Sequence, residues 1–173
     1  MSQLGFWFSH ISFQDLMADL TEDELWLSAL FAATFAPVLI VGPFGGVLVD
    51  RLDRKRVLIG AYVAIAVVSA IQVTLVATDN ITPVVLLITG AAMGTTLAVL
   101  GPAVGAITAN TVPIIDLPSA VSLQAMSSNL SRVVGPAMAA PLVRKDLFEA
   151  SWTIYIILAS LALIVVSLSL IHI

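Results

Sequence analysis

Residues 25–56 read LWLSALFAATFAPVLIVGPFGGVLVDRLDRKR, an uncharged apolar run that ends in a dense cluster of charges. A helix needs about 20 mainly apolar residues to cross a bilayer. The uncharged part, Leu25–Val49, meets that length without interruption. The stretch therefore predicts a membrane-spanning helix followed by a charged loop.

The rest of the chain repeats this arrangement. Of its 173 residues, 60% are hydrophobic and 10% are charged, whereas a soluble domain is about half apolar and a quarter charged. The alternating segments of about 10 residues that build a membrane barrel are not found in the sequence. We therefore predict an all-α membrane protein with six transmembrane helices, at Met1–Leu20, Leu25–Val49, Val57–Ala77, Pro83–Ala109, Ser119–Val143 and Trp152–Ile171.

Several function classes find no support in the sequence. There is no cysteine, so disulfides and zinc–thiolate sites are excluded. The chain has no H-E-x-x-H, no G-x-S-x-G and no acidic cluster at metal-ligand spacing, so we expect no enzyme activity, no metal and no cofactor. No basic run interleaved with aromatic residues predicts nucleic-acid binding.

The basic residues predict the orientation in the membrane. Four of the seven Lys and Arg residues lie in one short loop, as Arg51, Arg54, Lys55 and Arg56. Short loops rich in Lys and Arg stay on the cytoplasmic side. We therefore expect a multi-pass protein of the cell (inner) membrane with this loop and the N-terminus in the cytoplasm. Arg144 and Lys145 fall in a loop that this scheme places outside.

The stretch Gly46–Arg56 resembles the signature loop of the major facilitator superfamily. That loop contains Gly, a spacer, Leu, a small residue, Asp, Arg, a spacer, Gly, Arg, and then Arg or Lys. The matching residues here are Gly46, Leu48, Asp50, Arg51, Arg54 and Lys55. Asp53 replaces the second Gly, as in the exporter branch that includes siderophore and macrolide efflux proteins. Asn129–Pro136 is similar to the helix-five motif of that branch.

The resemblance implies a fold and a function. Residues 1–167 are expected to form the N-terminal six-helix half of a transporter, built from two inverted three-helix repeats, whose partner is a missing C-terminal six-helix half. The implied function is secondary active transport of a small molecule out of the cell by alternating access. An ion gradient would drive it, with protons as a candidate, although helix four lacks the arginine typical of proton-driven drug antiporters. The alternative is a non-transporting six-helix membrane subunit or scaffold.

The resemblance also implies a role for Asp50. In the family this carboxylate latches onto the second six-helix half and holds one state of the transport cycle, with Gly46, Arg51, Arg54 and Lys55 in the same loop. Asp50 lies at the C-terminal end of its helix, where the helix dipole disfavours a negative charge. The alternative is a cluster of solvated charges that only fixes the topology.

Polar residues inside the predicted helices are candidates for the translocation path. Arg132 lies near the middle of its helix, where insertion costs about 2.5–3.5 kcal/mol, so it should face the bundle interior with a partner. Asn129 shares its face, and Asp15 is the best carboxylate candidate for an ion pair. Whether Arg132 serves structure or translocation stays open. His10 and Gln14 share a helix face with one another, and His10 could equally be a packing residue.

Small residues recur at intervals of four, which allows helix backbones to approach closely. We expect helix packing at Gly42, Gly46, Gly90, Gly94, Gly101, Gly105, Gly135 and Pro136. At the other end of the chain, Leu168–Ile173 reads LSLIHI, which is what the start of a transposon end used in library preparation encodes. We expect this segment to be adapter read-through.

Overall fold

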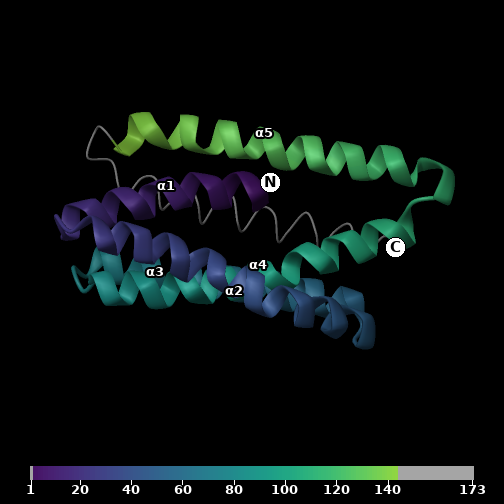
Figure 1. Ribbon diagram of the computed structural model, residues 1–173, viewed down its shortest axis with the longest axis horizontal. Coiled ribbons are helices and arrows are strands. Elements are labelled where there is room, and N and C mark those ends of the chain that lie inside the picture. Colours follow the sequence, from purple (N-terminus) through teal and green to yellow (C-terminus); the bar gives the residue numbers. More distant parts are fainter. Residues whose placement is uncertain (1, 144–173) are drawn as a thin grey trace.

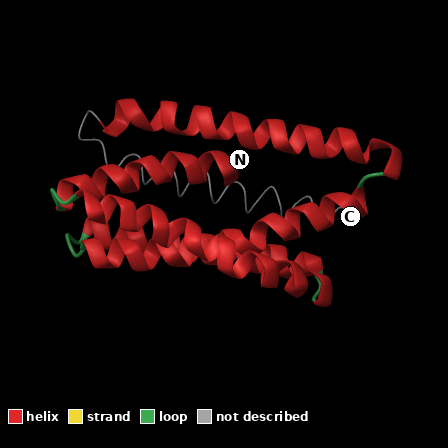
Figure 2. Ribbon diagram, in the orientation of Figure 1, coloured by secondary structure: helices red, strands yellow, loops and turns green. Residues whose placement is uncertain are grey.

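The computed structural model describes residues 2–143, and the side chains of residues 3–139. Within that range the chain is helical and contains no strand (Figures 1 and 2). The expected sixth helix, Trp152–Ile171, and the segment Leu168–Ile173 lie outside the described residues. The elements are α1 (Ser2–Leu20), α2 (Glu24–Arg51), α3 (Arg54–Ala77), α4 (Pro83–Thr111), the 3-10 turn η1 (Ile114–Asp116) and α5 (Leu117–Val143).

Side-chain caps determine where three of the helices begin. The carboxylate of Asp23 accepts a hydrogen bond from the Leu25 N–H at 2.9 Å, and Thr82 caps α4 in the same manner. The Asp53 carboxylate accepts from the N–H groups of Lys55 at 2.9 Å and Arg56 at 3.2 Å. These bonds satisfy backbone donors that have no partner inside the helix. Only the two residues Leu52 and Asp53 therefore separate α2 from α3.

Three helices are long and apolar enough to cross a membrane, namely α2, α3 and α4 with 28, 24 and 29 residues. The other two, α1 with 19 residues and α5 with 27, have a suitable length but are less apolar. Both carry polar side chains on faces that meet other helices. The described part of the chain thus supplies three of the expected spans on composition alone.

Helix α4 joins α2 and α3 into one group of helices. It packs along α2 and along α3, whereas α2 and α3 scarcely touch each other despite the short connection. Helix α1 packs mainly along α5, and Figure 1 shows this pair beside the group formed by α2, α3 and α4. Two pairs, α2 with α4 and α1 with α5, therefore make the largest contacts in the described part.

Glycines allow these two pairs to approach closely. A Cβ on Gly94 would overlap the carbonyl oxygen of Thr34, and one on Gly45 would lie 2.7 Å from the carbonyl oxygen of Ala98. In the other pair, a Cβ on Gly135 would lie 2.8 Å from the Cβ of Trp7. A Cβ at Gly90 would meet the Thr34 hydroxyl at 3.0 Å. The backbones pack in contact at these points.

The other glycines of the four-residue pattern do not lie at close helix contacts within the described residues. Within the described residues, a Cβ at Gly42, Gly46, Gly101 or Gly105 would meet no atom within 4 Å. Gly45, which the four-residue pattern did not single out, makes a closer approach than Gly42 or Gly46. Pro136, beside Gly135, is half-buried.

Candidate translocation site

A cavity of about 370 Å³ is lined by residues of α1, α2, α4 and α5 and by Tyr62 of α3. Its polar residues come from α1 and α5: Gln3, Gln124, Ser127, Ser128 and Arg132. The facing walls are apolar and aromatic, and include Trp7, Phe35, Val38, Leu97 and Leu100. Such a mixture of apolar walls and few polar groups is typical of a small-molecule site. The open space at Gly101 belongs to this cavity.

Arg132 is the charged residue of the cavity wall. Its Cζ lies 5.5 Å from the centroid of the Trp7 ring. A cation over an aromatic face is stabilised by about 0.5–1 kcal/mol when exposed and by about 2 kcal/mol when desolvated. Trp7 therefore holds the guanidinium at the cavity wall, where the Arg132 side chain is exposed rather than turned into the bundle interior, as expected from the sequence. Among residues 2–143 its N–H groups have no hydrogen-bond partner.

The expected ion pair between Asp15 and Arg132 is not formed among residues 2–143. The reason is the register of α1 against α5. Gly135 packs on the backbone of α1 at Leu4 and Phe8, so Arg132, one turn earlier in α5, reaches Trp7. Asp15 lies eight residues further along α1, which at 1.5 Å per residue is about 12 Å.

A polar face of α5 was missed in the sequence. Gln124, Ser127 and Ser128 precede Arg132 at helical spacing, so all four fall on one side of the helix. The structure brings these residues together at the cavity, whereas Asn129 is exposed and lies off the cavity wall. The three-to-four-residue spacing of the polar side chains was the available signal.

His10 is buried in a cluster of aromatic rings. Its ring lies parallel to Phe6 at 5.8 Å and perpendicular to Phe35 at 5.4 Å, between centroids. The Nε2 atom is 3.4 Å from Nε2 of Gln14. His10 therefore packs α1 against α2 beside the cavity without lining it. Gln14 and Asp15 are half-buried and also lie off its wall.

The signature loop lies at the junction of α2 and α3. Asp50 and Arg51 are exposed in the last turn of α2, and within residues 2–143 neither has an ion-pair partner. Arg54 is half-buried, and its Nη1 donates to the carbonyl oxygen of Ala106 in α4 at 3.5 Å. Lys55 is exposed, and Gly46 lies one turn before Asp50 in α2. Arg54 therefore reaches α4 through one long hydrogen bond, while Asp50 is exposed.

The groups that line the cavity are suited to binding an organic molecule. The cavity offers hydroxyls, amides, aromatic faces and one guanidinium, which together can hold an organic molecule by hydrogen bonds and stacking. Among the residues that the structure describes, no group of three or more His, Cys, Asp or Glu side chains could hold a metal ion. The apolar helices and the polar cavity between them define a multi-pass membrane protein.

Comparison with known proteins identifies the family. A family model described as transmembrane secretion effector matches residues 1–172. A macrolide efflux protein A of Streptococcus pyogenes is 33% identical over 127 residues, which cover 72% of this chain and 31% of that protein. The protein of that name from Enterococcus faecalis is 36% identical over 109 residues, 61% of this chain and 33% of that protein. An uncharacterised MFS-type transporter of Mycobacterium tuberculosis is 44% identical over 43 residues, 25% of this chain and 10% of that protein.

The chain belongs to the transmembrane secretion effector family of the major facilitator superfamily. The relatives that it matches are named as efflux proteins and transporters, not as enzymes. The chain spans about a third of the length of the macrolide efflux proteins that it matches.

Proposed function

We propose that this chain is the N-terminal six-helix half of a secondary transporter that exports small molecules by alternating access. The observation that carries the proposal is the polar face of α5, with Arg132 held over Trp7, in a cavity between four helices. A membrane helix keeps an arginine at a cost of about 2.5 kcal/mol or more, and such residues commonly mark substrate pathways. Membership of an exporter family supports the same interpretation.

The helix pairing supports two inverted three-helix repeats. In that plan α1 corresponds to α4 and α2 to α5. Exchanging the repeats converts the α1–α5 pair into the α4–α2 pair, and these are the two largest contacts in the described residues. Substrate sites of inverted-repeat transporters lie near the bilayer midplane between repeats or halves. The cavity would then be one wall of the complete site, and a C-terminal half would supply the other.

Asp50 would latch the two halves together on the cytoplasmic side. Its carboxylate is exposed in the last turn of α2, where the helix dipole disfavours it, so a cationic partner elsewhere in the protein would stabilise it. Arg54, bonded to Ala106, would keep the loop rigid. The open faces at Gly42, Gly46 and Gly105 leave room for further helices to pack closely.

An ion gradient would supply the energy, because the sequence has no nucleotide-binding loop. Protons are a candidate coupling ion. The names of the relatives suggest macrolides as a first substrate class to test. Large amphipathic molecules of this kind suit a cavity in which aromatic walls face hydroxyls and amides.

The test is an accumulation assay in cells that lack their own efflux pumps. Cells that express the full-length protein should accumulate less macrolide, siderophore or dye than cells that express an Asp50→Asn variant at equal membrane abundance. A protonophore should abolish the difference if protons drive export. Unchanged accumulation for every compound would reject export, and full activity of Asp50→Asn would reject the latch.

A further inference from the structure

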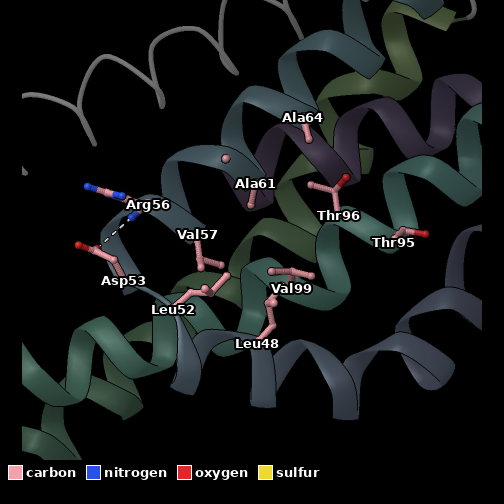
Figure 3. Close-up of a pocket in the computed structure, with 11 residues that line it drawn as sticks. Leu48, Leu52, Asp53, Arg56, Val57, Ala61, Ala64, Thr95, Thr96 and Val99 are labelled. Atoms are coloured by element: carbon pink, nitrogen blue, oxygen red, sulfur yellow. Dashed lines mark hydrogen bonds between the residues drawn. The ribbon is translucent and has the colours of Figure 1, made fainter.

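A second hollow opens between α2 and α3. It shares no lining residue with the polar cavity and is more apolar. These helices diverge from their two-residue connection, and α4 forms the floor between them. The hollow has a volume of about 490 Å³. We call this hollow the α2–α3 groove. Its α3 side is a single helical face: Asp53, Arg56, Val57, Gly60, Ala61 and Ala64. Figure 3 shows Arg56 and Asp53 at one end and Ala64 toward the other.

The inside of the groove is apolar. Leu48 and Val99 contribute aliphatic side chains from α2 and α4. The hydroxyls of Thr95 and Thr96 donate to carbonyl oxygens of their own helix, at 2.8 Å to Ala91 and 3.0 Å to Ala92. These threonines therefore present satisfied polar groups and exposed methyl groups. The wall requires no polar partner from an occupant.

One end of the groove is lined by the exposed cation Arg56, beside Asp53. The Arg56 guanidinium has no hydrogen-bond or ion-pair partner among residues 2–143. The Asp53 carboxylate is already engaged with the N-terminal N–H groups of α3. Across the loop, the four basic residues Arg51, Arg54, Lys55 and Arg56 outnumber the acidic Asp50 and Asp53. The end of the groove thus attracts an anion.

The groove opens onto apolar surface suited to lipid. Exposed aliphatic side chains flank it on α2, at Val47 and Leu48, and on α3, at Ile59 and Val63. From Arg56 to Ala64 the α3 face extends eight residues, or about 12 Å. An apolar channel that starts at a cationic site and runs into the membrane matches the shape and charge of a phospholipid. Basic pockets between transmembrane helices bind anionic head groups.

We propose that the α2–α3 groove binds one anionic phospholipid. The phosphate lies at Arg56, and an acyl chain runs along Val57, Gly60 and Ala64 against α4. Bound there, the lipid fills the space between two helices that make few contacts with each other. This site is separate from the translocation cavity and does not depend on the direction or substrate of transport.

The test measures lipid binding by the purified full-length protein in detergent. Native mass spectrometry counts bound phosphatidylglycerol, and thermal melting reports its stabilising effect. Phosphatidylcholine tests the charge of the head group, and glycerol 3-phosphate tests the head group without its chains. We expect one retained phosphatidylglycerol and a higher melting temperature, with neither effect from the other two probes.

Two variants with matched controls locate the site. Arg56→Gln should weaken phosphatidylglycerol binding roughly fivefold, whereas Arg51→Gln removes an equal charge from the loop but not from the groove lining and should weaken it clearly less. Gly60 lines the groove and has no atom within 4 Å of its Cβ position, so Gly60→Leu places a bulky side chain in the groove and should displace the lipid. Val63→Phe adds comparable bulk beside the groove and should leave binding intact.

Each other result would overturn the proposal. Equal binding of phosphatidylcholine, or an effect of glycerol 3-phosphate alone, would exclude an anionic lipid as the occupant. Equal losses in Arg56→Gln and Arg51→Gln would indicate diffuse surface charge. A dimer that dissociates in Gly60→Leu would assign the groove to a second copy, and retained lipid in Gly60→Leu would place the lipid elsewhere.

Discussion

The carbonyl oxygen of Thr34 in α2 lies against Gly94 of α4 so closely that no Cβ fits between them. A backbone oxygen can yield only if the helix moves. We therefore predict that Gly94→Ala destabilises the protein by about 1–3 kcal/mol, the usual cost of overpacking.

Gly101→Ala is the matched control for this prediction, because the same helix offers open space there. It should be neutral or stabilising by up to about 1 kcal/mol, since alanine favours helices over glycine. Melting temperatures of the purified variants in detergent compare the two. Equal melting temperatures would contradict the close contact of α2 with α4.

The cap of α3 gives a second prediction. Asp53 accepts two backbone hydrogen bonds at the start of the helix, so Asp53→Ala should cost about 1 kcal/mol of stability. Asp53→Gly should cost only a few tenths, because glycine is itself an acceptable cap residue. The signature pattern of the superfamily has glycine at this place, and capping explains how aspartate can replace it. If Asp53→Ala melts like the unmodified protein, the cap contributes nothing.

Gln72 of α3 gives a third prediction. Its side chain is fully buried, and neither its amide nitrogen nor its oxygen has a hydrogen-bond partner in the described part of the chain. An unsatisfied buried polar group costs about 1–3 kcal/mol. Gln72→Met, which keeps the length without the amide, should therefore raise the melting temperature.

Ser69 provides the comparison for Gln72. It is buried one turn earlier on α3, but its hydroxyl donates to the Ile65 carbonyl oxygen at 2.7 Å. Ser69→Ala should thus change stability little or lower it slightly. A lower melting temperature for Gln72→Met would show that the amide is bonded in the complete protein.

The fourth prediction concerns transport and rests on the proposed function. Arg132→Gln removes the cation from the cavity wall and should lower the export rate at least about tenfold, or about 1.4 kcal/mol. Arg132→Lys keeps the charge but loses the planar stacking on Trp7, so it should retain part of the activity. Asn129→Ala, on the same helix but off the cavity wall, is the control. Equal export by Arg132→Gln and Asn129→Ala, at equal membrane abundance, would exclude Arg132 from the path.

The helices within residues 2–143 were predictable from the sequence, because long apolar runs admit few other structures in a membrane. The exact ends of these helices were less predictable. The expected ranges stopped at charged residues, whereas the helices stop at caps, so α2 includes Arg51 and α3 begins at Arg54. A charge is tolerated inside a helix end, and only the loss of backbone hydrogen bonds terminates the helix.

The site was predictable only in part. Arg132 could be singled out because a charge inside a membrane helix is costly. Its contact with Trp7 could not be predicted. Which residue of α1 it meets depends on where Gly135 rests on α1, and that register follows from backbone contact between helices distant in sequence. The same reason explains why Gly94 is in tight contact while Gly101, in an identical four-residue pattern, borders open space.

The arrangement in which α4 joins α2 to α3 has a consequence for biogenesis. Helices enter the membrane in the order in which the ribosome makes them, yet α2 meets its main partner only two helices later, and α1 meets its own four helices later. Helices α1 and α2 are therefore only loosely associated in the bilayer until their main partners are inserted. The assembly of the described helices becomes cooperative only after α4 and α5 have been inserted.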